Sequence, residues 1–264
     1  MNLQDRDNPE ACCAGNGGGR RLLITAGPTH EPIDAVRYLA NRSSGRLGVE
    51  LANAAADVGW SVTLLLGPVG DATRAAVDTR ARTIGFRSTA DLEHLLAEHL
   101  TDADVLVMAA AVADYRPALA ARPGPGAGGA GRVGEVGGKI RREKKNITLE
   151  LEPTPDLLAG CASRRSPGQL LVGFALEPRE RLMESAREKL ARKRVDLIVA
   201  NPLETMDASS IEATLIGSPS IGASPDGIVA QTGGPIEKSA FAPWLLRQID
   251  RARAARCAGG QAVS

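Results

Sequence analysis

The stretch RYLANRSSGRLG gathers charged, amide and hydroxyl side chains directly before an apolar helical pattern. Ser43, Ser44 and Gly45 stand where that helix is expected to begin, and Gly48 follows one turn later. Free backbone N–H groups and the positive end of a helix dipole bind anions, and small residues let a phosphate approach closely. The stretch therefore predicts either a phosphate site or a plain helix cap, in which a serine accepts a backbone hydrogen bond and the glycines only ease packing.

Arg37 and Asn41 lie four residues apart in the same stretch. If this segment is helical, the spacing places both side chains on one helix face, where together they could hold a carboxylate or a phosphate. The alternative is that both are solvated surface residues.

A second loop, MAAAVADYRP, follows an apolar run further along the chain. Met108, Ala109 and Ala110 would offer backbone groups and little bulk, so that a flat ring or a pantoyl group could lie against them. Asp114 could accept hydrogen bonds from a ligand, help to hold a metal ion, or simply cap the next turn.

Two basic features could also meet an anion. The run KIRREKK at 139–145 carries charge at six of its seven positions, which is typical of a solvated face, but a Gly-rich stretch before it would let the run fold over bound phosphates. Lys189 and Lys193 share one face of a predicted helix and could reach an anion or extend from the surface.

Cysteines and histidines are too few and too scattered for a metal cage. The four cysteines show no C-x-x-C spacing and no neighbouring histidine, which is typical of reduced thiols in a cytosolic protein. A formal charge of +1 and an aromatic content of 3% argue against nucleic-acid binding, and no apolar stretch is long enough to cross a membrane.

The elements that must position these residues alternate between apolar strands and amphipathic helices. RRLLITA, WSVTLLLGP, TRARTIGF, ADVLVMAAA, LLVGFALEP and DLIVAN read as strands. GRLGVELANAAADVG, STADLEHLLAEHL, RERLMESAREKLARKR and the closing segment PIEKSAFAPWLLRQIDRARAA read as helices. The alternation predicts an α/β fold with a Rossmann-like, doubly wound and mostly parallel sheet. In such sheets ligands bind beyond the carboxyl ends of the strands, where the loops described above lie.

The same reading divides the chain into one domain with additions. It predicts a disordered lead-in at 1–20, a single domain at 21–250, a flexible Gly/Ala/Pro-rich insertion at 117–138, a small β unit at about 202–235 and a C-terminal tail at 251–264. The first loop lacks G-x-G-x-x-G and is too long for the tight turn of a dinucleotide fingerprint. This argues against an NAD(P)- or flavin-binding oxidoreductase, which the strand–helix rhythm would otherwise favour.

Several segments, in order along the chain, resemble the phosphopantothenate-cysteine ligases, also called phosphopantothenoylcysteine synthetases. These segments are ITAGPTHEPIDAVRYLANRSSGRLG, AAAVADYRP, KIRR, LELEPTPDLLAG, LVGFALE, KLARKRVDLIVAN and IEKSAF, and together they cover nearly all of 22–246. The resemblance implies a cytoplasmic enzyme of coenzyme A biosynthesis that joins 4'-phosphopantothenate to L-cysteine through an acyl-nucleotide. A nucleoside triphosphate, CTP in preference to ATP, would drive the reaction with Mg2+ and without flavin. The family is dimeric, which implies a homodimer with the small β unit as its dimerisation region.

The resemblance also implies roles for individual residues. Asn41 would position the acyl-nucleotide for the amine, and Lys139 would stabilise the charge that builds on the α-phosphate. Arg37 would reach into the other subunit's site, and the substrate side would be held by Asn41, Ala109, Ala110 and Asp114. The nucleotide would be held by Gly27, Ser43, Gly45, Gly48, Met108, Ala109, Ala110, Asp114, Thr154, Pro155, Asp156, Leu157, Phe174, Lys189 and Lys193.

The chain departs from the family pattern in places. The segment from Tyr115 to Gly138 is much longer than the usual loop, which bears on how the KIRR arm closes, and TMDASSIEATLIG lacks the Asn of the family's D-x-N signature. About 20 residues precede the first predicted strand. A domain needs at least about 50 residues, so the chain is expected to be a stand-alone ligase without the flavin-dependent decarboxylase found in many bacterial members. A non-catalytic relative would have lost Asn41 or Lys139, and both are present.

Overall fold

A parallel sheet forms the centre of the molecule. The computed structural model describes residues 20–118, 146, 148–206, 208–218, 221 and 223–260. The strands of the main sheet within these ranges are β1 (Arg21–Ala26), β4 (Ser61–Leu66), β5 (Arg82–Gly85), β6 (Val105–Met108), β9 (Leu170–Glu177), β10 (Leu197–Pro202), β12 (Thr214–Gly217) and β13 (Ile228–Gln231). Their order is β13-β12-β10-β9-β6-β1-β4-β5. The strands from β10 to β5 are parallel, and β12 and β13 continue the sheet as antiparallel strands.

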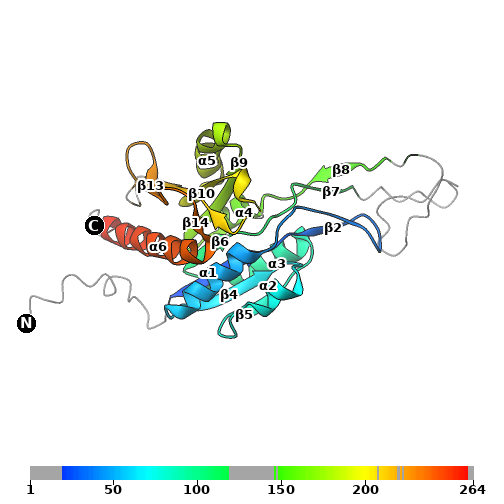
Figure 1. Cartoon of the computed structure of the whole chain (residues 1–264), viewed down its shortest axis with the longest axis horizontal. Helices are drawn as coiled ribbons and strands as arrows, with labels where there is room; N and C mark the ends of the chain where they lie inside the picture. The colour runs from blue at the N-terminus through cyan, green and yellow to red at the C-terminus, as the bar shows by residue number, and fades with distance from the viewer. Residues whose placement is uncertain are drawn as a thin grey trace, which may run out of the picture.

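Helices cover both faces of this sheet, which confirms the predicted doubly wound α/β fold (Figure 1). The helix α1 (Arg46–Asp57) and the closing helix α6 (Lys238–Gly260) pack on one face. The helices α3 (Thr89–His99), α4 (Leu157–Arg164) and α5 (Arg179–Lys193) pack on the other, and α2 (Asp71–Ala75) is a short helix before β5. Near-continuous burial along β1, β6 and β10 is what a parallel sheet covered on both faces requires.

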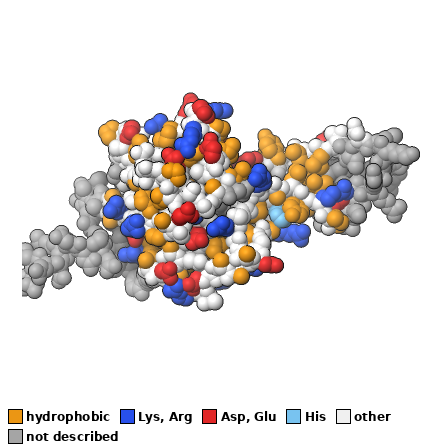
Figure 2. All heavy atoms as spheres, in the orientation of Figure 1, with side chains coloured by type: hydrophobic (Ala, Val, Ile, Leu, Met, Phe, Trp, Pro, Cys, Tyr) orange, Lys and Arg blue, Asp and Glu red, His pale blue; other side chains and the backbone are white. Residues whose placement is uncertain are grey.

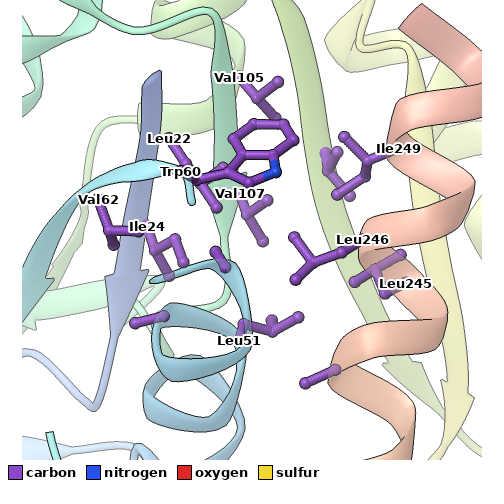
Figure 3. Packing of buried hydrophobic residues seen from close by; sticks show 14 of the residues in the cluster. Leu22, Ile24, Leu51, Trp60, Val62, Val105, Val107, Leu245, Leu246 and Ile249 are labelled. Atoms are coloured by element: carbon purple, nitrogen blue, oxygen red, sulfur yellow. The ribbon is translucent and has the colours of Figure 1, made fainter. Parts of the chain in front are cut away.

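The larger core lies between the sheet and the pair α1 and α6. Leu51 of α1 and Leu246 of α6 point toward each other, and Val107 of β6 lies beside them (Figure 3). On the same face Trp60 and Val105 lie near Ile249 of α6 (Figure 3). Burial of these large side chains against α6 makes that helix part of the domain core. None of the helices in the described ranges has both the length and the apolar composition needed to cross a bilayer.

Three short ladders lie outside the main sheet. The strand β2 (His30–Pro32) pairs with β3 (Tyr38–Ala40), β7 (Tyr115–Pro117) pairs with β8 (Leu151–Pro153), and β11 (Ser210–Ile211) pairs with β14 (Ile236–Glu237). The β2–β3 hairpin and the β7–β8 ribbon contact each other and together project from the body of the molecule as an arm (Figure 1).

Two segments that the sequence set apart belong to larger elements of the structure. The strands β12 and β13 fall inside the range of the expected small β unit and continue the main sheet. The helix α6 runs to Gly260, past the expected start of a tail at 251. Residues 1–19 and 119–145 lie outside the described residues, and with them Lys139, nearly all of the predicted insertion and lead-in, and the KIRREKK run.

The sheet has a step at its carboxyl edge. The last pair between β6 and β9 joins Val107 to Val172, whereas β9 continues beside β10 until Glu177. The last part of β9 therefore stands beyond the end of β6 and forms a wall there.

Candidate functional site

A cleft of about 950 Å³ lies at this step, beyond the carboxyl ends of β6, β9 and β10. This is where doubly wound sheets bind their ligands. The cleft brings together most of the residues that were predicted from the sequence, namely Asn41, Ser43, Gly45, Gly48, Met108, Ala109, Ala110, Asp114, Thr154, Pro155, Asp156, Leu157, Phe174, Lys189 and Lys193. Gly27 and Arg37 are not in its lining, and Lys139 lies outside the described residues.

The N-terminus of α1 opens into the cleft without a side-chain cap. Gly45 is the N-cap residue of the helix, with a φ of 72°, and as a glycine it makes no side-chain cap bond. Ser43 Oγ instead accepts a long bond of 3.4 Å from Gly45 N, and Ser44 Oγ one of 3.5 Å from Arg46 N. The serines therefore shape the turn before the helix, and the phosphate site stays a prediction. The first turn keeps its positive end directed at the cleft.

The glycines around this turn do serve close packing. A Cβ on Gly48 would lie 2.4 Å from the Cβ of Ala26, so α1 can lie against β1 only with glycine at this position. A Cβ on Gly45 would lie 2.7 Å from Val69 Cγ1 and 3.4 Å from the Cα of Gly27, which itself has a φ of 83°. Gly27 thus supports the turn from behind the cleft.

Arg37 and Asn41 lie on either side of a short strand and not on one helix. Residues Tyr38–Ala40 form β3, so the two side chains do not share a helix face and that possibility is wrong. The guanidinium of Arg37 donates to the carboxylate of Asp34, with Nε 2.9 Å from Oδ2, at the tip of the β2–β3 hairpin. Asn41 reaches the cleft, where its Nδ2 donates to the carbonyl oxygen of Val112 at 2.9 Å.

The loop after β6 is held by hydrogen bonds along its length. The backbone N–H groups of Ala109, Ala110 and Ala111 donate to Thr25 O at 3.1 Å, Thr25 Oγ1 at 3.1 Å and Gly27 O at 2.9 Å. Because these amides are already engaged, the groups that Ala109 and Ala110 can offer a ligand are their carbonyl oxygens.

Asp114 ends this loop with an exposed side chain in the cleft lining. Its backbone carbonyl accepts from Thr154 N at 2.9 Å, which ties the loop to the segment before α4. In the described part of the chain, no group of three or more His, Cys, Asp or Glu side chains could hold a metal ion.

The helix α5 contributes a polar face with a spacing of three and four residues. Ser185, Glu188, Lys189, Arg192 and Lys193 all line the cleft. Lys189 Nζ donates to the carbonyl oxygen of Phe174 on the wall strand β9. Burial, and next the charge of Lys193, lower the pKa of Lys189 to about 8, although nearby carboxylates act in the opposite direction.

Asp156 links α5 to the start of α4. Its Oδ1 accepts from Ala159 N at 3.1 Å as the helix cap and lies 3.0 Å from Lys193 Nζ. Burial alone would raise the pKa of Asp156, but the bond from Ala159 and the ion pair with Lys193 outweigh burial and lower it. The carboxylate is thereby kept ionised beside the lysines.

Other residues of the cleft were missed in the sequence. Asn201 is 8% exposed at the carboxyl end of β10, and its Nδ2 donates to Thr205 Oγ1 at 2.8 Å. A polar residue directly after the apolar run DLIVA is the same signal that singled out Asp114, and it could have found Asn201. The lining contains six basic residues, Arg42, Arg46, Lys189, Arg192, Lys193 and Lys238, against four acidic ones, Asp114, Asp156, Glu177 and Glu188. This balance favours an anionic ligand.

A family model and a solved structure match most of this chain. The family described as the DNA/pantothenate metabolism flavoprotein C-terminal domain matches residues 18–125 and 130–220. A solved structure of the C-terminal domain of the coenzyme A biosynthesis bifunctional protein CoaBC superposes with a TM-score of 0.65 at 31% identity, over 88% of this chain and 94% of that one.

Two curated relatives are similar over most of the chain. The bifunctional protein CoaBC of Mycobacterium tuberculosis (strain ATCC 25618 / H37Rv) is 41% identical over 193 residues, which are 69% of this chain and 42% of that protein. A protein named cysteine/cysteine sulfinic acid decarboxylase, from an unknown prokaryotic organism, is 40% identical over 186 residues, 70% of this chain and 46% of its own length. The chain thus spans less than half the length of these relatives.

Proposed function

Because the chain belongs to the family of the DNA/pantothenate metabolism flavoprotein C-terminal domain, we propose that it is a phosphopantothenate-cysteine ligase. It would join 4'-phosphopantothenate to L-cysteine in coenzyme A biosynthesis. The observation that carries the proposal is the cleft itself, where an uncapped helix N-terminus, the lysines of α5 and the Ala109–Asp114 loop meet. One end of this arrangement suits phosphates and the other suits the pantoyl group and its amide.

The reaction has two steps. In the first, a carboxylate oxygen of 4'-phosphopantothenate attacks the α-phosphorus of a nucleoside triphosphate, an acyl-nucleotide forms and pyrophosphate leaves. In the second, the amine of cysteine attacks the acyl carbon, the amide bond forms and the nucleoside monophosphate leaves. Neither step needs a nucleophilic side chain, so catalysis rests on positioning and on electrostatic stabilisation of phosphate charge.

Separate parts of the cleft would serve the two substrates. The first turn of α1, at Gly45 and Gly48, would receive the phosphates, and Lys189 and Lys193 would meet polar groups of the nucleotide near Phe174. Opposite them, Asn41 is held at the Val112 carbonyl, where its amide can position the acyl-nucleotide for the amine. Next to Asn41, the carbonyl oxygens of the alanine loop can accept hydrogen bonds from the pantoyl hydroxyl and amide.

Magnesium would act here together with the phosphates. Mg2+ is usually held by one or two carboxylates plus substrate phosphates, with water in the remaining positions. Asp114, whose exposed carboxylate faces the cleft, fits this requirement. When bound, the ion would neutralise charge on the departing pyrophosphate. We propose CTP in preference to ATP, no flavin, and a cytoplasmic location, all on the family resemblance.

A homodimer is part of the proposal. Val36, Tyr38, Tyr115 and Leu151 are 61%, 48%, 56% and 47% exposed and belong to the projecting arm of β2–β3 and β7–β8. Hydrophobic side chains gather on this part of the surface (Figure 2). We therefore propose this arm as a subunit interface beside the expected region at 202–235, whose β13 is the edge strand of the main sheet. Sedimentation equilibrium should give twice the chain mass, and a monomer at all accessible concentrations would contradict this part.

Turnover tests the function directly. Purified protein is mixed with 4'-phosphopantothenate, Mg2+ and either CTP or ATP, with and without cysteine, and pyrophosphate and product mass are followed. We expect cysteine-dependent product, formed faster with CTP, and none in a tube that lacks nucleotide. If neither nucleotide gives product, the ligase assignment is wrong.

A matched pair of asparagines sharpens the test. We expect Asn41→Ala to lower the rate by about 10²-fold, the effect typical of losing a donor that stabilises a reaction intermediate. Asn53→Ala serves as the control, because Asn53 also bonds to backbone, at Ala76 O (2.8 Å) and Asp78 N (2.9 Å), but lies outside the cleft. It should lower stability while the rate stays near normal. Equal rates for the two variants would contradict the proposed role of Asn41 in the reaction.

A further inference from the structure

We propose that Glu31, which does not line the cleft, is a positioning residue that holds the pantothenate side of the site in place. The inference rests on the proposed function, because it concerns which substrate the affected side binds. It follows from a small buried polar cluster behind the cleft and from two connections that lead from this cluster to cleft residues.

The cluster consists of Thr29, Glu31 and Thr89, which are 0%, 3% and 1% exposed. Glu31 Oε1 accepts from Thr89 N at 2.8 Å and from Thr89 Oγ1 at 2.6 Å, and the hydroxyl oxygens of Thr89 and Thr29 are 3.3 Å apart. Thr89 is the first residue of α3, so the carboxylate lies at the positive end of that helix dipole. A buried carboxylate is costly unless it is hydrogen-bonded, and these two bonds fix its position.

The first connection leads to the loop after β6. Thr29 Oγ1 accepts from Ala113 N at 2.9 Å, and Thr29 N donates to Ala111 O at 3.3 Å. Ala113 lies between Val112, whose carbonyl oxygen holds Asn41, and Asp114. The cluster therefore sets the path of the backbone on which the proposed substrate contacts depend.

The second connection runs through the β2–β3 hairpin. Glu31 pairs with Leu39 in this hairpin, and Asn41 follows the end of β3 directly. An isolated two-stranded hairpin is at best marginally stable, so this one needs an anchor. The bonds of Glu31 to Thr89, together with His30 N to Arg87 O at 2.7 Å, attach the hairpin to the start of α3.

The α4–α5 part of the nucleotide side is built without this cluster, although Asp114, the proposed magnesium ligand, lies on the loop that the cluster holds. The contacts of the α4–α5 part join α4 to α5 through Asp156 and Lys193, and α5 to β9 through Lys189 and Phe174. Loss of Glu31 should therefore weaken the binding of 4'-phosphopantothenate more than the binding of the nucleotide. A general loss of stability would affect both.

The test compares KM and kcat for Glu31→Ala, Glu31→Gln and Thr89→Val. We expect Glu31→Ala to raise the KM for 4'-phosphopantothenate about tenfold or more, and the KM for the nucleotide by less than about twofold. Glu31→Gln keeps an oxygen that accepts from Thr89 and should restore most of the loss. Thr89→Val removes only the hydroxyl and should change the same KM by a smaller factor, which keeps the proposal testable if Glu31→Ala fails to fold.

Asp91→Ala is the matched control. Asp91 accepts from Ser88 N at 2.8 Å and Arg87 N at 3.1 Å at the same end of α3, and within the described residues its side chain bonds neither to the hairpin nor to the loop after β6. This variant should lower the urea midpoint and leave both KM values near normal. Equal changes in both KM values for folded Glu31→Ala, or no change in either, would overturn the role of Glu31.

Amide hydrogen exchange separates the failure of this inference from the failure of the proposed function. In Glu31→Ala the amides of Ala111 and Ala113 should exchange faster than in the unchanged protein, whereas those of β4 should not. This readout does not depend on turnover. Unchanged exchange at both amides would overturn the inference even in an active ligase, whereas faster exchange without ligase activity would overturn only the function.

Discussion

At the scale of single residues, Lys189 combines a place in the cleft with an altered protonation equilibrium. Burial is the main cause of its lowered pKa of about 8, the charge of Lys193 adds to it, and Asp156 and Asp114 oppose it. Below that pH the side chain is an ammonium ion that can attract phosphate, and above it the side chain is a neutral amine. An ordinary lysine, with a pKa near 10.4, would keep its charge throughout this range.

The affinity for nucleotide should therefore fall as the pH rises from about 7 to about 9.5, with a midpoint close to the pKa of about 8. Calorimetric Kd values for CTP across this range measure the effect. Lys189→Arg stays protonated throughout and should show no such transition. If Lys189→Arg keeps the same midpoint, another group is responsible for it.

At this scale the sequence could predict only relations between residues that are close together in the chain. The four-residue spacing of Lys189 and Lys193 places them on one helix face whatever surrounds the helix. The ion pair of Lys193 with Asp156 was beyond reach, because it joins two helices whose relative placement depends on the whole sheet. The bond of Arg37 to Asp34 had a local signal, a three-residue separation, but it required knowledge of the turn at the tip of the β2–β3 hairpin.

At the scale of elements, the contact between α1 and β1 decides where the helix N-terminus points. Gly48 permits this contact because its missing side chain leaves room for Ala26. A helix displaced from β1 would carry its first turn away from the cleft.

Gly48→Ala should consequently lower the free energy of unfolding by about 1–3 kcal/mol, as overpacked positions do, and weaken nucleotide binding. Gly160→Ala is the matched control, since it lies inside α4 and the nearest atom to its new Cβ would be Arg164 Nη2 at 3.8 Å. That change should stabilise by about 0.4–1 kcal/mol. Urea unfolding of both variants measures the difference. A Gly48→Ala protein as stable as the unchanged one would show that α1 can shift without cost.

Elements with strong local signals were predictable, and those held by distant partners were not. The capping box of Ser88 and Asp91 at the start of α3 is such a local signal, because both residues lie within one turn. For the eight-residue helix α4, the cap residue Asp156 was almost the whole of the local sequence signal. Strands β2 and β3 have three residues each and depend on α3 and the loop after β6, so no periodicity could reveal them.

At the scale of the whole molecule, the end of α6 is fastened to the amino ends of β9 and β10. Asp196, with a side chain 4% exposed, lies 2.8 Å from Arg165 Nη1 and also pairs with Arg256 of α6. Arg256 further donates to Gln169 O at 2.7 Å, and Ala252 is 1% exposed. The last turns of α6 thus complete the core that the first turns begin.

Removing residues after Asp250 should therefore destabilise the protein, whereas removing only the residues after Gly260 should not. Arg256→Ala alone should cost about 2 kcal/mol, because a charged hydrogen-bond partner of the buried Asp196 is lost. Thermal unfolding of the two truncated chains and of the variant gives the comparison. If a chain ending at Asp250 is as stable as one ending at Gly260, residues 251–260 do not contribute to the core and behave as a tail.

The alternation of strands and helices was enough to predict the sheet and its double winding, because apolar period and length are local properties. The contact that holds the last turns of α6 was not predictable, since Asp196, the partner of Arg256, lies far away in sequence. The same limit applies to β12 and β13, whose place in the main sheet depends on pairing with β10.

The loop after β6 has a consequence for inhibition. Residues Ala109, Ala110, Ala111 and Ala113 bear only methyl side chains, so a ligand seated on this floor contacts the main chain. Point mutations cannot remove a peptide carbonyl, and a larger side chain would fill space that the proposed natural substrate also needs. A compound that binds the carbonyl oxygens of Ala109 and Ala110 would therefore leave few single-residue routes to resistance that preserve activity.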